Sequence, residues 1–224
     1  MKNSDPDKFR TFGRAKGRPL SGVQQRLFDD LYPTVKIDLA NPLAGLDRFD
    51  KVAFEIGIGG AEHLLWQAAR NPDTAFIGAE PFQNGIAKAL RGIDSEALDN
   101  VILHHGDARD ILDVLPSHAL DTVYVLFPDP WPKPKHHKRR IINPTFLNNI
   151  HRVLKPGGIF RFGSDIIHYV DWTLTRVSNH GGFDWSPQSQ ADWRVRHDDW
   201  PSTRYLEKAL REGRTGHFFT FTTI

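Results

Sequence analysis

The sequence predicts an α/β fold: a seven-strand, mostly parallel sheet with helices on both faces and an antiparallel hairpin at one edge. Short apolar runs alternate with amphipathic segments from position 51 onward, which is the pattern of repeated βα units. Parallel strands need crossover connections, so each amphipathic segment is expected to form a helix that covers the sheet. Acidic residues also follow the first four apolar runs, about one βα unit apart.

The first expected helix covers 23–31, where apolar residues recur at helical spacing and Ser21 precedes them as a cap. Strands and helices then alternate, each strand as a short apolar run and each helix with one apolar face. In order, we expect strand 51–57, helix 61–69, strand 74–80, helix 82–90, strand 100–108, a short helical turn ending near Leu115, and strand 121–130.

The second half begins with another helix, which proline and glycine at 156–158 bring to an end. The last two strands flank a polar insertion that is rich in tryptophan, and they are expected to pair as the antiparallel edge. The remaining elements are, in order, helix 144–154, strand 158–165, helix 167–179, and strands 181–186 and 216–224.

Composition excludes several classes of protein. The chain of 224 residues is 39% hydrophobic, enough for one domain over 23–224, preceded by a basic and flexible N-terminal arm over 1–22. The absence of cysteine excludes a disulfide framework, a Cys-ligated zinc site and thiol catalysis. His136 and His137 point apart and lack a third ligand, so no metal is expected. Because no apolar leader or membrane-length run occurs, we expect a cytoplasmic protein without a membrane partner.

Four carboxylates are expected to meet at one edge of the sheet. They are separated by 25, 27 and 22 residues, and the carboxyl ends of parallel strands lie along the edge where open α/β sheets bind ligands. An acid after a strand is equally well explained as a helix cap when it is taken alone. Because all four acids recur at the same place relative to their strands, a shared pocket is favoured. The four residues are Glu55, Glu80, Asp107 and Asp129.

A glycine-rich loop follows the first strand, with Gly57 and Gly59 allowing a tight turn and a close approach of a ligand to the backbone. A pyrophosphate-binding GxGxxG motif would have glycine at position 62, but Glu62 stands there and would repel a phosphate. A ligand with an ammonium group, ribose hydroxyls and an adenine fits the acids better, with Glu55 near the ammonium. Glu80 would accept from the ribose and Asp107 would lie near the adenine amine. S-adenosylmethionine has these parts.

The segment VYVLFPDPWPK places Asp129 between two prolines in a rigid loop, with Trp131 offering a ring for stacking. A planar base with N–H groups on one edge would suit a carboxylate there. No acid occurs over 130–164, and a second basic group lies in the N-terminal arm, so a polyanion is the expected partner. The cationic residues are Lys133, Lys135, His136, His137, Lys138, Arg139 and Arg140, with Lys8, Arg10, Arg14, Lys16 and Arg18 in the arm.

Several segments together resemble the bacterial tRNA (guanine-N7)-methyltransferase family over nearly the whole chain. They are FEIGIGGAEHL, FIGAEPF, HHGDA, VLFPDPWPKPKHHKRR, GSD and a late TRY, in that order. The resemblance implies a Rossmann-like class I methyltransferase that uses S-adenosyl-L-methionine. It also implies a tRNA substrate, methylated at N7 of guanine 46 in the variable loop. Whether the chain is a monomer or a homodimer stays open.

The resemblance also implies roles for individual residues, with Asp129 as the active-site residue. One departure concerns the family segment T-x-[YF]-E, because Leu206 follows Tyr205 here and Glu207 comes one place late, so that its side chain points elsewhere. The donor would be held by Glu55, Gly57, Gly59, Glu80, Asp107 and Asp129, and the tRNA substrate by Lys133, Asp165, Thr203, Arg204, Tyr205 and Glu207.

Two other functions remain as alternatives: a methyltransferase with a small-molecule or protein acceptor, and a noncatalytic RNA-binding module on the same fold. A nicotinamide-dependent dehydrogenase is disfavoured by Glu62 and by the proline-flanked Asp129. Asp165 is equally well explained as a helix cap and as a substrate contact. His63, His104 and His105 are expected to pack or to cap helices rather than to catalyse.

Overall fold

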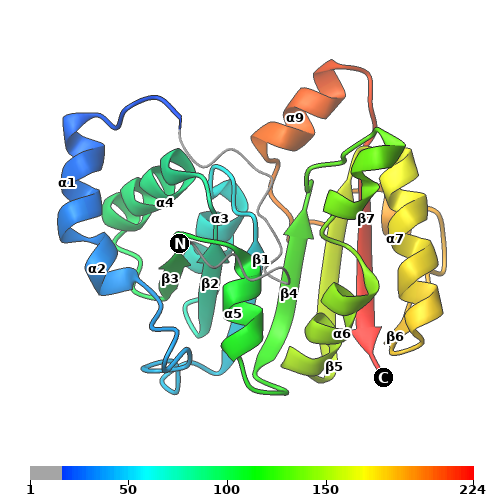
Figure 1. The fold of residues 1–224 in the computed structure, drawn as a ribbon, viewed down its shortest axis with the longest axis horizontal. Coiled ribbons are helices and arrows are strands. Elements are labelled where there is room, and N and C mark those ends of the chain that lie inside the picture. The colour runs from blue at the N-terminus through cyan, green and yellow to red at the C-terminus, as the bar shows by residue number, and fades with distance from the viewer. Residues whose placement is uncertain (1–16) are drawn as a thin grey trace, which may run out of the picture.

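The computed structural model describes residues 17–224, so most of the expected basic arm lies outside the described residues (Figure 1). Its strands form one seven-stranded sheet in the order β3-β2-β1-β4-β5-β7-β6, which confirms the predicted fold class. The strands are β1 (Lys51–Ile56), β2 (Thr74–Ala79), β3 (Val101–His104), β4 (Leu120–Leu126), β5 (Leu154–Ser164), β6 (Phe183–Asp184) and β7 (His217–Thr223).

Strands β1 to β5 pair in parallel, and β7 runs antiparallel to both β5 and β6. The expected antiparallel pair therefore lies at one edge, but the segment 185–216 separates its two strands in the chain. Strand β1 has β2 on one side and β4 on the other, so the strand order reverses there. Such a switch point is where open α/β sheets bind ligands.

The six expected helices are present, with differences at their ends, and the sequence did not predict four further helices, over 32–35, 134–139, 191–194 and 204–211. Helix α4 continues to Glu96 rather than ending near Leu90, because its apolar face extends to Ile93 and the chain leaves the helix only at Ala97 (φ +51°). The helices are α1 (Gly22–Asp30), α2 (Tyr32–Val35), α3 (Glu62–Arg70), α4 (Gln83–Glu96), α5 (Ala108–Val114), the 3₁₀ helix η1 (Pro134–Arg139), α6 (Pro144–Val153), α7 (Ile167–His180), α8 (Ala191–Arg194) and α9 (Arg204–Arg211).

Local signals explain two helix starts. Ser21 and Gln24 form a capping box at α1, in which the Ser21 hydroxyl accepts from the Gln24 N–H at 3.3 Å and the Gln24 amide oxygen accepts from the Ser21 N–H at 3.0 Å. Asn143 caps α6 by accepting from the Phe146 N–H at 3.0 Å, and Pro144 follows at the first helical position.

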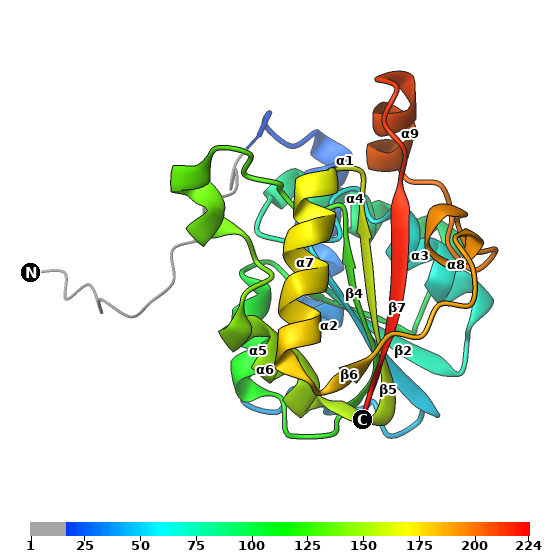
Figure 2. The same ribbon diagram turned by 90° about the vertical axis from the view of Figure 1, so that its right-hand side faces the viewer.

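Two apolar layers enclose the sheet. Residues of α5, α6 and α7 pack on one face and residues of α3 and α4 on the other, where α1 and α2 add partly buried side chains. Figure 2 shows α7 on one side of the strands and α3 on the other. Helix α9 lies above the carboxyl ends of the parallel strands (Figure 1), over a small cluster of Trp200, Leu206 and Phe218.

We predict that Asn100→Ala lowers the free energy of unfolding by about 1–3 kcal/mol. The buried Asn100 amide donates to the backbone oxygens of Ala68, Asn71 and Thr74 at 3.0–3.1 Å, joining the end of α3 to the starts of β2 and β3. Urea denaturation measures the change. Asn148→Ala, on the exposed face of α6, is the matched control and should change stability by less than about 0.5 kcal/mol. Equal losses of stability in the two variants would show that the hydrogen bonds of Asn100 do not stabilise the fold.

Candidate active site

Two of the four predicted carboxylates lie buried at the ends of adjacent strands. Glu55 near the end of β1 is 4% exposed, and its Oε2 lies 2.6 Å from His63 Nδ1 in α3. Glu80 directly follows β2, where its two oxygens accept from the N–H groups of Gly59 at 2.8 Å and of Phe82 at 2.9 Å. The Glu80 carboxylate therefore joins the glycine-rich loop to the start of α4.

Electrostatic effects show that these acids lie near one another. Burial raises the pKa of Glu80, and the charges of Asp129 and Glu55 raise it further, while the two N–H hydrogen bonds lower it. Burial also raises the pKa of Tyr205, with Glu80 and Asp129 contributing in the same direction. Glu55 and Tyr205 line the same pocket, and the charges of Glu80 and Asp129 act on it from nearby. A cationic ligand would relieve the repulsion among the acids.

Asp107 has a capping role in the structure. It is the N-cap of α5, and its carboxylate accepts from the Arg109 N–H at 3.0 Å and from Arg109 Nε at 2.9 Å. The helix-cap explanation considered for this acid is therefore correct. A contact with an adenine amine stays a prediction, which a partly exposed carboxylate at the end of β3 still permits.

The glycine-rich loop turns sharply between β1 and α3. Gly57 has φ +75° and Gly59 has φ +56°, in the left-handed region that glycine adopts without steric cost. Nothing lies within 4 Å of the position that a Cβ would take at Gly57, so a ligand can approach the backbone there. Glu62 occupies the first turn of α3 as expected and is paired with Arg204.

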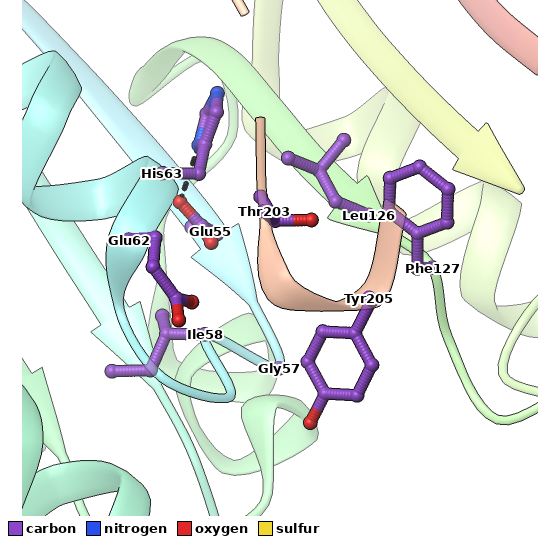
Figure 3. Close-up of a pocket in the computed structure, with 9 residues that line it drawn as sticks. All are labelled: Glu55, Gly57, Ile58, Glu62, His63, Leu126, Phe127, Thr203 and Tyr205. Atoms are coloured by element: carbon purple, nitrogen blue, oxygen red, sulfur yellow. Dashed lines mark hydrogen bonds and ion pairs between the residues drawn. The ribbon is translucent and has the colours of Figure 1, made fainter. Parts of the chain in front are cut away.

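The segment 203–205 lies across this loop and closes the pocket. A Cβ at Gly59 would lie 2.7 Å from the Tyr205 ring, and a Cβ at Gly60 would collide with the Arg204 guanidinium. Thr203 is the N-cap of α9, and its hydroxyl accepts from the Leu206 N–H at 3.3 Å. The pocket in Figure 3 is lined by Glu55, Gly57, Ile58, Glu62, His63, Leu126, Phe127, Thr203 and Tyr205.

The loop that carries Asp129 is held on both sides. The Phe127 N–H donates to the Gly163 oxygen at 2.7 Å, and Arg140 Nε donates to the Pro130 oxygen at 2.9 Å. Asp129 is itself exposed, and within residues 17–224 no hydrogen bond or ion pair engages its carboxylate. Desolvation by the surrounding protein nevertheless raises its pKa. Asp129 is therefore a fixed acceptor at the rim of the site.

Arg140 corrects the prediction for the cationic run. It is 2% exposed and lies 4.9 Å from the Tyr169 ring and 4.8 Å from the Trp172 ring, so it supports the Asp129 loop and is not available to a polyanion. The lysines of the run are exposed on and beside η1, with Lys133 at the N-cap. The Trp131 ring is partly covered by the Arg139 guanidinium, 4.8 Å from its centroid.

The other predicted substrate residues lie apart from the pocket floor. Asp165 accepts from Arg214 Nε at 2.7 Å, and the N-cap of α7 is Ile166, so the helix-cap explanation for Asp165 is wrong. Glu207 is exposed on α9, and its side chain has no partner among the described residues. Arg204 is exposed beside Tyr205 and pairs with Glu62.

Known proteins are similar to this chain over most of its length. A family model described as putative methyltransferase matches residues 50–219. A tRNA (guanine-N(7)-)-methyltransferase of Agrobacterium fabrum is 47% identical over 216 residues, covering 94% of this chain and 93% of that protein. One of Roseobacter denitrificans is 46% identical over 220 residues, covering 94% of each. The chain belongs to the tRNA (guanine-N7)-methyltransferase family.

Solved structures similar to this family member show the same class I methyltransferase fold. The aminoglycoside resistance methyltransferase NpmB1 has a TM-score of 0.56 at 17% identity, covering 84% of this chain and 95% of that chain. A precorrin-6y C5,15-methyltransferase from Geobacter metallireducens GS-15 has a TM-score of 0.52 at 15% identity, covering 78% and 80%. At this identity the likeness shows the fold alone.

The sequence did not predict several residues of the site. His63 packs against Tyr124 as expected, but its hydrogen bond to Glu55 in the pocket was not predicted. Gly85 in α4 was also missed: a Cβ there would lie 2.5 Å from the Gly59 oxygen and 2.8 Å from Glu80 Cγ. A glycine inside an amphipathic helix is a signal that could have indicated this close approach.

Two negative findings apply to the described part of this family member. Residues 17–224 contain no group of three or more His, Cys, Asp or Glu side chains that could hold a metal ion. None of the helices in this part is long and apolar enough to cross a membrane.

We predict that Gly85→Ala is about 1–2 kcal/mol less stable than Gly92→Ala, although alanine favours both helical positions. At Gly85 the new methyl group would meet the Gly59 backbone and Glu80, neither of which can move without opening the site. At Gly92 it would meet the end of the Leu65 side chain, which can rotate. Urea midpoints measure both variants, and equal stabilities would show that the loop tolerates displacement.

Proposed function

We propose that the chain transfers a methyl group from S-adenosyl-L-methionine to N7 of guanine 46 in the variable loop of tRNA, in the cytoplasm. One observation carries the proposal: the Asp129 carboxylate, which has no partner among residues 17–224, closely follows Phe127 of the pocket that Glu55 also lines, and Glu80 is anchored to the glycine-rich loop of this pocket. The names of the relatives and the exposed lysines near η1 support the choice of acceptor.

The residues present fit the methyl donor. Glu80 is anchored by two backbone N–H groups, and each of its oxygens keeps a lone pair for a ribose hydroxyl. Glu55 Oε1 is free of the His63 contact and suits an ammonium group. Asp107 would face the adenine amine, and the open backbone at Gly57 lets the chain of the ligand pass. When bound, the donor supplies a methyl group on a positively charged sulfur.

Asp129 orients the acceptor rather than deprotonating it. Guanine N7 carries an in-plane lone pair and no proton, so no base is needed before the N–C bond forms. The Asp129 carboxylate accepts from the guanine N1–H and exocyclic amine and stabilises the positive charge that develops on the ring. Alignment of the reacting atoms contributes most, on the order of 7–11 kcal/mol in well-oriented systems.

Tyr205 is the side chain best placed to stack on the guanine. A structured tRNA base has to swing out to reach the pocket, which costs a few kcal/mol. Tyr205 is 48% exposed and lies beside the acids, whereas the Trp131 ring is already in contact with Arg139. Lys133 near η1 and Lys208 on α9 are exposed and can contact phosphates, which offsets the cost of base extrusion.

Incubation with unmodified tRNA and labelled donor, followed by borohydride and aniline cleavage, tests the acceptor atom. We expect label in the tRNA and a single new cleavage site at the variable-loop guanine, because aniline cleaves at 7-methylguanosine after reduction. A tRNA with adenine at that position is the matched control and should take up no label. Label without cleavage would mean that another atom accepts the methyl group, and binding without label would favour a noncatalytic module.

We predict that Asp129→Asn lowers kcat for tRNA methylation on the order of 10²-fold. The asparagine keeps the size of the side chain but removes the charge and presents an N–H donor where the guanine also donates. Asp171→Asn, on the exposed face of α7, is the control and should retain full activity. Steady-state rates with saturating donor measure the effect. Full activity of Asp129→Asn would refute the role given to this carboxylate.

A further inference from the structure

A continuous line of hydrogen bonds leads from the pocket floor to the segment that carries Thr203. His63 Nδ1 lies 2.6 Å from Glu55 Oε2, as Figure 3 shows, and His63 Nε2 lies 3.3 Å from Gln67 Nε2. Gln67 Nε2 also donates to the backbone oxygen of Asp199 at 2.6 Å. The three side chains of the line are at most 4% exposed, so water does not compete for these contacts.

The pattern of donors and acceptors has one consistent solution. The Gln67 amide oxygen accepts from Asn71 at 3.2 Å, which leaves its two N–H hydrogens for Asp199 and for His63 Nε2. His63 Nε2 is then an acceptor, and the hydrogen of the neutral imidazole is on Nδ1. That hydrogen is donated to Glu55, which fixes the carboxylate and leaves Oε1 facing the pocket.

The Asp199 end of this line is held by an ion pair and by a buried neighbouring residue. The Asp199 carboxylate accepts from Arg161 Nη1 at 2.5 Å, and the next residue, Trp200, is 2% exposed. Thr203 and Tyr205 come four and six residues after Asp199, and both line the same pocket as Glu55. The segment 199–205 is therefore linked to Glu55 by hydrogen bonds through two side chains of α3.

We propose that His63 is a positioning residue for Glu55 and that Gln67 couples the segment 199–205 to the methyl-donor site. The inference rests on the proposed function, because it assigns Glu55 to the ammonium group of the donor. His63 orients the carboxylate that binds this group, and Gln67 ties the orientation to the segment that meets the tRNA. Neither side chain touches a reacting atom.

Isothermal titration with S-adenosylhomocysteine tests the first half on the full-length protein. His63→Ala should weaken binding about tenfold, the size expected for losing one hydrogen bond to a charged group. In His63→Asn, the amide N–H can take the place of Nδ1–H, so affinity should return to within about threefold of the unaltered protein. His151→Asn, on α6 and away from the pocket, is the matched control and should bind normally.

Equilibrium binding of tRNA in saturating S-adenosylhomocysteine tests the second half. Gln67→Met fills a similar volume but removes the amide, so tRNA affinity should fall about fivefold while affinity for S-adenosylhomocysteine stays within about threefold. Unchanged affinity in His63→Ala, equal losses in His63→Ala and His63→Asn, or unchanged tRNA affinity in Gln67→Met would each overturn the proposal. Urea midpoints confirm that each variant is folded.

The two proposals fail in different ways. Both readouts are equilibrium binding, so they do not require methyl transfer. An unaltered protein that binds S-adenosylhomocysteine and tRNA but transfers no methyl group would refute the proposed function and leave the positioning role standing. An unaltered protein that does not bind S-adenosylhomocysteine would overturn both.

Discussion

The site depends on the register of the parallel strands, which brings their carboxyl ends to the same edge of the sheet. Ile56 in β1 pairs with Ala79 in β2 and with Val125 in β4, so the three strands finish at the same height. Strand register, rather than any contact between the two acids, therefore places Glu55, which is opposite Gly78, and Glu80, two residues further along, at the same edge of the sheet. A shift of register by one residue would turn Glu55 to the opposite face of the sheet and remove it from the pocket.

Gathering acids at this edge costs free energy that the surrounding structure has to offset. Backbone N–H groups do so at Glu80, a buried imidazole does so at Glu55, and a guanidinium does so at Asp107. Asp129 receives no such compensation among the described residues, and its pKa is raised. Asp129 lies at the rim of the site, where the N–H groups of an incoming base can donate hydrogen bonds to its carboxylate.

The sequence predicted those features that depend on local chemistry. The strands, the cap at Ser21 and the row of acids follow from periodicity, hydrogen-bonding side chains and spacing. The other features of the site depend on contacts between segments that are far apart in the chain. Nothing near Arg140 indicates that two aromatic rings from α7 would bury it, and nothing near Asp165 indicates a pairing with Arg214. The approach of Tyr205 to Gly59 likewise joins segments that are far apart in the chain.

The choice of acceptor must come from parts of the chain outside the common fold. Methyltransferases named for an aminoglycoside resistance activity and for a precorrin share this fold. In this chain the floor of the pocket comes from β1, the glycine-rich loop and α3, whereas its rim comes from the end of β4 with the residue after it and from the segment between β6 and β7. The exposed Lys133, the phenol of Tyr205 and the Asp129 carboxylate, which has no partner within the described part of the chain, lie on or beside this rim. A line of hydrogen bonds through α3 joins the segment between β6 and β7 to Glu55 on the floor, so under the proposed function the same buried side chains would connect the acceptor side of the pocket to the donor side.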